Sequence, residues 1–175
     1  MRSLADAERV RAFISAAGAA AAHDGVCYLT GGATAVLVGW RGTTIDVDVR
    51  LEPEQDELMR ELPRIKRELE VNVELASPGD FIPLPGGWRE RGLSIGKEGS
   101  LTFLHFDPYS QALAKLERGH AYDLEDVAAM QRLGLVEGAR LLDLFAEIES
   151  ELYRFPAIDP ARFRAAVEDK MRPSD

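Results

Sequence analysis

The sequence contains a single cysteine, Cys27, and therefore cannot form an intramolecular disulfide. Cys27 stands in the apolar run Val26–Leu29, where a thiol is expected to be buried and to act as a small hydrophobic side chain. The three histidines, His23, His105 and His120, are widely spaced and have no cysteine partner. A zinc site built from cysteine and histidine is therefore not expected.

Long apolar runs are also absent. No stretch could span a bilayer, and the N-terminus lacks the basic, apolar and cleavage regions of a signal peptide, so we expect a cytoplasmic protein without membrane association. Basic residues are scarce, because 21 Lys and Arg stand against 30 Asp and Glu and give a formal net charge of -9. This charge argues against general DNA binding, although a local basic patch could still hold one end of an RNA.

Alternating apolar residues predict short strands and helical periodicity predicts several helices, so the expected class is α+β. Strands are expected at 26–30, 43–51, 71–75, 92–96 and 101–106. Helices are expected at 4–22, 33–38, 54–69, 108–118, 123–133, 138–154 and 160–170. Pro63 predicts a kink or break in its helix. A hairpin turn is expected at Lys97, Glu98 and Gly99. The proline and glycine content of 77–92 predicts a loop.

The predicted elements divide the chain into two parts. Residues 1–107 are expected to form the core, and residues 108–175 a helical part packed on it. With 175 residues, 46% of them hydrophobic, the chain suits one domain with a buried interior. No linker separates the two parts, so we expect a single structural unit.

Two acidic residues, Asp46 and Asp48, interrupt an otherwise apolar strand pattern. Side chains alternate between the faces of a strand, so both carboxylates should point the same way, about 7 Å apart. Ile45, Val47 and Val49 should point into the core. Two like charges on one face favour a divalent cation as counter-ion. The alternative is an ordinary strand whose aspartates face solvent.

A glycine pair, Gly31 and Gly32, precedes this strand. Glycine lets the backbone turn tightly and lets a phosphate approach bare N–H groups. The short helix expected from Ala33 would direct its positive end toward that phosphate. A glycine pair after a strand is usually only a turn. The full order of strand, glycine pair, short helix and Asp-x-Asp strand is what favours a nucleotide site.

This order resembles the signature of the nucleotidyltransferase superfamily, which includes DNA polymerase beta, aminoglycoside nucleotidyltransferases and tRNA CCA-adding enzymes. The match covers residues 26–50. The resemblance implies a mixed β-sheet flanked by helices, followed by the helical C-terminal part. It also implies that Asp46 and Asp48 bind two catalytic Mg²⁺ ions and that Gly31 and Gly32 contact a nucleoside triphosphate.

The superfamily usually adds a third carboxylate on a neighbouring strand, and Glu74 is the candidate here. Glu74 and Asn72 share the polar face of their predicted strand, which could bring Glu74 beside the two aspartates as a catalytic residue and metal ligand. The family residue is more often Asp, so Asp80 in the following loop is the competitor. An ordinary exposed glutamate is the alternative for Glu74. Thr34 and Thr44, close to the glycine pair and the acidic strand, are further nucleotide-binding candidates.

A second segment, Tyr109–Arg118 followed by Asp123–Val127, resembles the helix pair of AbiEii-type toxins and related minimal nucleotidyltransferases. This resemblance implies that Lys115 reaches the triphosphate. The alternatives are a solvated helix position for Lys115 and N-terminal capping for Asp123 and Asp126.

These patterns predict an enzyme that transfers a nucleoside monophosphate from a magnesium-bound nucleoside triphosphate to a hydroxyl group of tRNA, a protein or a small molecule. The AbiEii-type resemblance adds a toxin–antitoxin role with an antitoxin partner. Arg89 and Arg91, which follow Trp88, could grip a nucleic-acid acceptor or simply face solvent. The alternative function is a catalytically weak nucleotide-binding or protein-interaction module of the same fold.

Overall fold

The computed structural model of the protein describes residues 3–171 and confirms the α+β class. The chain forms two compact units. The first contains the residues up to Ser77 together with Gly92–Phe106, and the second contains Pro78–Arg91 together with the residues from Asp107 onward. The helical part therefore also includes 78–91, a segment that the sequence assigned to the core. Packing of the two parts into one structural unit stays a prediction.

A five-stranded mixed sheet forms the centre of the first unit, with strand order β3-β2-β1-β5-β4. The central strand β1 runs antiparallel to β2 and parallel to β5, β2 runs parallel to β3, and β5 runs antiparallel to β4. The strands are β1 (Gly25–Thr30), β2 (Asp46–Glu52), β3 (Asn72–Leu75), β4 (Leu93–Glu98) and β5 (Leu101–His105). Each strand overlaps the range predicted from its alternating pattern.

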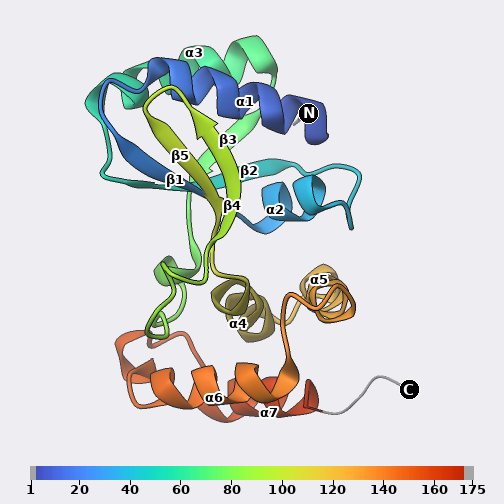
Figure 1. The fold of residues 1–175 in the computed structure, drawn as a ribbon. Helices are drawn as coiled ribbons and strands as arrows, with labels where there is room; N and C mark the ends of the chain where they lie inside the picture. Colours follow the sequence, from blue (N-terminus) through green and yellow to red (C-terminus); the bar gives the residue numbers. More distant parts are fainter. Residues whose placement is uncertain (1–2, 172–175) are drawn as a thin grey trace. The chain divides into compact units, whose positions relative to one another are not determined.

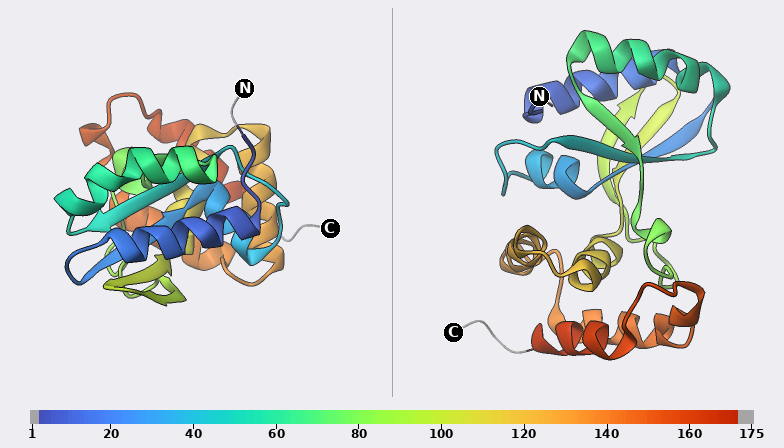
Figure 2. Two further views of the ribbon diagram at one scale, coloured as in Figure 1. Left: turned by 90° about the horizontal axis from the view of Figure 1, so that it is seen from above. Right: turned by 180° about the vertical axis from the view of Figure 1, so that it is seen from behind.

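Three helices accompany this sheet: α1 (Ala7–Ala20), α2 (Gly31–Val38) and α3 (Asp56–Leu69). Figures 1 and 2 show α1 and α3 side by side over the sheet. Leu58, Leu62 and Ile65 recur at helical spacing on α3 and are buried. Together with apolar residues of α1, α2 and the strands they form one core, which includes Phe13, Val36, Cys27, Leu29, Val47, Val49, Leu101 and Phe103.

Cys27 is fully buried in this core, as its apolar context predicted. Burial raises the pKa of its thiol to about 12, because the charged thiolate is poorly solvated there. Cys27 is therefore a packing residue and not a nucleophile.

Several element boundaries differ from the predicted ones. Helix α2 begins at Gly31 instead of Ala33, with Thr30 at its N-cap position. Helix α3 continues through Pro63, so the predicted break does not occur. The β4–β5 turn consists of Gly99 and Ser100, because β4 extends to Glu98. The predicted helix 138–154 ends at residue 149 and is followed by a short 3-10 turn.

The N-terminal end of the predicted strand 43–51 also differs. Strand β2 begins only at Asp46, and Ile45, which was expected in the core, is 48% exposed. Ile45 lies before the first residue that pairs with β3, where no neighbouring strand covers it. Thr44 instead forms an isolated antiparallel bridge with Ala5.

The second unit is helical. Its elements are η1 (Pro78–Asp80), α4 (Pro108–Arg118), α5 (Ala121–Arg132), α6 (Gly138–Glu149), η2 (Leu152–Arg154) and α7 (Pro160–Asp169). Helix α4 contacts α5, α6, α7 and η1, and is buried along most of its length. Phe145 of α6 and Phe163 of α7 pack edge to face with ring centroids 4.8 Å apart. Among residues 3–171, no helix is long and apolar enough to cross a membrane.

Candidate functional site

Asp46 and Asp48 lie on the same face of β2, as the alternation predicted, and both side chains are half-buried. The residues between and after them, Val47 and Val49, face the core. In the register of the sheet, Asp48 lies opposite Thr30, the last residue of β1. The acidic pair is therefore placed beside the point where β1 ends and the glycine pair begins.

The glycine pair forms a close contact with this acidic strand. Gly31 has φ +60°, a left-handed backbone conformation that strongly favours glycine. A Cβ atom at Gly31 would lie 3.1 Å from Oδ2 of Asp48. The carboxylate of Asp48 is therefore in contact with the turn at Gly31.

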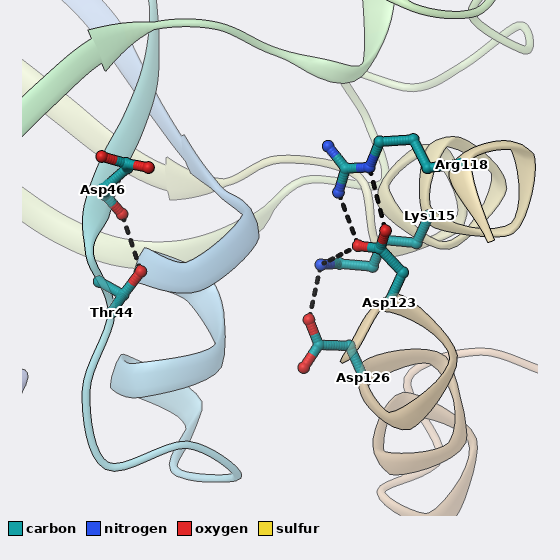
Figure 3. A network of polar contacts seen from close by, with 6 residues as sticks. All are labelled: Thr44, Asp46, Lys115, Arg118, Asp123 and Asp126. Atoms are coloured by element: carbon teal, nitrogen blue, oxygen red, sulfur yellow. Dashed lines mark hydrogen bonds and ion pairs between the residues drawn. The ribbon is translucent and has the colours of Figure 1, made fainter. Parts of the chain in front are cut away.

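Gly32, the second residue of the turn, lies where α2 approaches Thr44. A Cβ atom at Gly32 would lie 1.9 Å from Oγ1 of Thr44, which is far inside contact distance. The hydroxyl of Thr44 donates a hydrogen bond of 2.9 Å to the main-chain oxygen of Asp46 (Figure 3). Thr44 is 7% exposed, and its side chain fills the space between the start of β2 and Gly32 of α2. This geometry favours a supporting role for Thr44 over direct contact with a nucleotide.

The close packing at Gly32 predicts a measurable cost of substitution. Gly32→Ala is expected to lower the free energy of unfolding by about 1–3 kcal/mol, because the added methyl group must displace Thr44. Gly42→Ala is the matched control, because a Cβ atom there meets nothing within 4 Å. The control should change stability by about 0.5 kcal/mol or less in urea denaturation. Equal stability of the two variants would contradict the close approach of α2 to Thr44.

The parallel pairing of β2 and β3 brings Glu74 opposite Asp48 and Asn72 opposite Asp46. The Nδ2 amide of Asn72 donates to Oδ1 of Asp46 at 2.5 Å and to Oε1 of Glu74 at 3.0 Å. Glu74 is thus on the acidic face, beside the aspartates, as predicted. Its competitor Asp80 lies in η1, an element of the second unit.

The donor set of this face suits magnesium. Mg²⁺ in nucleotide sites is usually held by one or two carboxylates together with the phosphates of the substrate. Among the residues that the structure describes, no group of three or more His, Cys, Asp and Glu side chains is arranged to hold a metal ion. Asp46 and Asp48 could therefore hold the ion with phosphate oxygens completing its coordination.

Thr34, another predicted nucleotide contact, is buried in α2 with 3% exposure. Its hydroxyl donates to the main-chain oxygen of Leu29 at 3.2 Å and lies 3.1 Å from Nδ1 of His105 on β5. Sequence patterns predicted no role for His105, because the partner of this histidine is 71 residues away in the chain. Burial lowers the pKa of His105 to about 4, so its imidazole is neutral at pH 7.

The low pKa of His105 predicts a dependence of stability on pH. The ordinary histidine pKa of 6.5 applies to the unfolded chain, so between pH 6.5 and about 4 the unfolded state takes up a proton that the folded state does not. Stability is thus fully present above pH 6.5 and falls by up to about 3 kcal/mol as the pH approaches 4. Urea denaturation of wild type and His105→Asn across this range should show a smaller loss in the variant. Parallel curves would contradict the assignment.

In the second unit, Lys115 is at the centre of a buried charge network (Figure 3). Its Nζ donates to Oδ2 of Asp126 at 2.6 Å and lies 3.7 Å from Oδ1 of Asp123. Arg118 donates to both carboxylate oxygens of Asp123, at 2.7 and 3.1 Å. The side chain of Lys115 is only 5% exposed. The suggestion of a solvated helix position for Lys115 is therefore wrong, and contact with a triphosphate stays a prediction.

The alternative role for Asp123 as a helix N-cap is also wrong. The N-cap position of α5 belongs to His120, and Asp123 lies in the first turn. The helix begins earlier than predicted because α4 ends at Gly119 in the left-handed conformation and the chain re-enters a helix almost at once. The carboxylate of Asp123 is then available for Arg118.

The arginines of the segment 78–91 have local partners. Arg91 donates to the carboxylate of Asp107 at 2.8 Å and to the main-chain oxygen of Gly86 at 2.6 Å. Asp107 is the N-cap of α4, so Arg91 attaches this segment to the helical unit. The guanidinium of Arg89 lies over the ring of Trp88, 4.2 Å from its centroid. Arg91 is thus a structural residue, and Arg89 remains the one of the pair with its side chain exposed.

A protein-family model described as "Nucleotidyltransferase of unknown function (DUF6036)" matches residues 12–167, and the chain belongs to that family. The matched range includes every predicted site residue, from Gly31 to Lys115. Membership agrees with the predicted nucleotidyltransferase superfamily, while the closer likeness to AbiEii-type toxins stays a prediction. No curated protein and no solved structure matches the chain.

Proposed function

We propose that the protein transfers a nucleoside monophosphate from a magnesium-bound nucleoside triphosphate to a hydroxyl acceptor. The observation that carries this proposal is the contact of Asp48 with the turn at Gly31, on the strand face that also presents Asp46. A phosphate that binds the backbone of the turn would lie beside both carboxylates. This is the arrangement that nucleotidyl transfer needs, and the family membership supports it.

The residues of the first unit supply distinct parts of the site. The N–H groups at Gly31 and Gly32 and the positive end of α2 bind and orient the triphosphate. Asp46 and Asp48 would hold magnesium, as one ion or a pair, and the metal would supply charge neutralisation at the reacting phosphate. Glu74 accepts the proton of the attacking hydroxyl, whose oxygen bonds to the α-phosphorus while the bond from that phosphorus to the bridging oxygen breaks and pyrophosphate leaves. Because the reaction demands positioning and charge stabilisation above all, these few groups suffice.

The acceptor belongs to one of three classes: tRNA, a protein or a small molecule. A cytoplasmic toxin–antitoxin role, with Lys115 contributing to triphosphate binding, is part of the same proposal and rests on the AbiEii-type resemblance. The net charge of -9 favours an acceptor that is not a long polyanion, or an RNA that is held at one end only.

A second candidate function is nucleotide binding without transfer, in a module that acts through a protein partner. It is favoured by the pairing of Lys115 with Asp126, because an ammonium held in a buried ion pair is not available to a phosphate.

Incubation with magnesium and each of the four α-³²P-labelled ribonucleoside triphosphates, with total bacterial RNA, bacterial protein extract or an aminoglycoside as acceptor, separates the two functions. Label transfer that requires magnesium and disappears in Asp46→Asn supports the enzyme. Magnesium-dependent binding without transfer supports the module. Absence of binding of all four triphosphates in calorimetry would refute both.

A further inference from the structure

His105 ends strand β5 directly beside Leu29 of the parallel strand β1. It is 8% exposed, and Thr34, whose hydroxyl lies 3.1 Å from its Nδ1, is 3% exposed. Thr34 donates in turn to the main-chain oxygen of Leu29. A single chain of hydrogen bonds thus joins β5, α2 and β1, and it meets α2 three residues after Gly31, in the first turn of the helix.

The direction of these hydrogen bonds follows from the chemistry of the hydroxyl group. A threonine hydroxyl carries one hydrogen, and that of Thr34 is donated to Leu29. Its oxygen can therefore only accept from His105, so the neutral imidazole carries its proton on Nδ1 and a lone pair on Nε2. In this arrangement, Nδ1–H of His105 donates to Oγ1 of Thr34.

This pair is not needed to satisfy the backbone. The main-chain oxygen of Leu29 already accepts a hydrogen bond of 2.7 Å from the N–H of Phe106. An apolar side chain at position 105 would fill the space without the cost of burying an imidazole. What the pair adds is a directional constraint on α2, since it fixes the helix relative to both strands at the level of its first turn.

We propose that His105 is a positioning residue for nucleotide binding, which holds Thr34 and thereby fixes the first turn of α2 so that its N–H groups face the triphosphate. The inference rests on the proposed function, because it assigns the α2 turn to the triphosphate. His105 itself touches neither the phosphates nor the carboxylates in this role. Its effect should appear in binding of the nucleotide, with less change in turnover once the nucleotide is bound.

The test compares His105→Leu, His105→Asn, Thr34→Val and the double variant His105→Leu/Thr34→Val in the full chain. Calorimetry measures the Kd for ATP, CTP, GTP and UTP with magnesium, and also for magnesium with inorganic triphosphate. His105→Leu and Thr34→Val should each raise the Kd of the bound nucleotide about threefold to tenfold, the range expected for one lost hydrogen bond. The double variant should be no worse than either single one. His105→Asn should recover most of the affinity, because its amide can donate in place of Nδ1.

A second readout is independent of binding. Long-range ¹⁵N–¹H correlation spectra at pH 7 should show a neutral His105 with its proton on Nδ1, and Thr34→Val should shift that signal. A proton on Nε2, or a charged imidazole, would overturn the assignment. If His105→Leu fails to fold, His105→Asn, Thr34→Val and the spectra still test whether His105 positions Thr34.

The outcomes separate this inference from the proposed function. If the wild-type protein binds none of the four nucleotides and no inorganic triphosphate, both the proposed function and the positioning role of His105 are wrong. If the wild type binds but His105→Leu binds equally well, only the inference fails. Weak binding by His105→Leu that asparagine does not restore would assign the loss to packing and would likewise overturn the positioning role.

Discussion

Replacing Asp126 with alanine is expected to lower the free energy of unfolding by about 3–5 kcal/mol, the range found when one partner of a buried ion pair is removed. The ammonium of Lys115 would lose its partner at 2.6 Å and, within the described part of the chain, would retain only Asp123, 3.7 Å away and already shared with Arg118. Since the side chains of Lys115 and Asp126 are 5% and 2% exposed, water cannot take over that role. Urea denaturation followed by circular dichroism measures the loss.

Two controls define what this result means. Glu151→Ala removes one partner of the exposed pair Arg154–Glu151 and should cost about 1 kcal/mol or less. The double variant Lys115→Met/Asp126→Leu removes both charges and should recover most of the stability of the wild type. If Asp126→Ala is as stable as Glu151→Ala, the ammonium must reach solvent easily, and Lys115 would then be free to act on a triphosphate.

Replacing Asp48 with asparagine should reduce label transfer about a thousandfold. Metal-assisted charge stabilisation contributes several kcal/mol to such a reaction, and each 1.36 kcal/mol corresponds to a factor of ten in rate. Asparagine keeps the size of the side chain, so the contact with the turn at Gly31 is retained while the charge is lost. The rate is measured under saturating magnesium and nucleotide.

Glu52→Gln is the matched control for Asp48→Asn. Glu52 lies on the same face of β2, is half-buried, and forms an ion pair of 2.8 Å with Arg50. Loss of its charge changes the net charge by the same amount but leaves the glycine turn and both aspartates in place, so transfer should stay within about twofold of the wild type. A comparable loss in both variants would point to a general electrostatic effect and would remove the special role of Asp48.

The acidic strand and the glycine turn could be predicted because their signals are local. Alternation alone places Asp46 and Asp48 on one face, and the backbone requirement at Gly31 is a property of glycine itself. The antiparallel pairing of β1 with β2 places the glycine turn, which follows β1, beside the start of the acidic strand. The position of Glu74 beside Asp48 followed from the same alternation in β3.

The partners of polar side chains could not be predicted in this way. The amide of Asn72 contacts Asp46, which is 26 residues away in the sequence, and His105 contacts Thr34, which is 71 residues away. Contacts at such separations produce no periodic pattern in the sequence. For Lys115, the solvated helix position was wrong, because burial and the ion pair with Asp126 depend on tertiary packing that helical spacing does not reveal. Its contact with a triphosphate stays a prediction. Sequence patterns specify faces and turns, and tertiary packing specifies which polar groups meet.

The division of the chain after Ser77, Arg91 and Phe106 has a practical consequence for dissection of the protein. The polypeptide leaves the sheet unit, returns to it and leaves again, so neither unit is one continuous segment. Expression of a fragment that stops near residue 107 would carry the 78–91 stretch without the α4 helix to which Arg91 attaches it through Asp107. The sheet unit can be studied alone only after that stretch is replaced by a short bridge between Ser77 and Gly92, and the helical unit needs a link from Arg91 to Asp107.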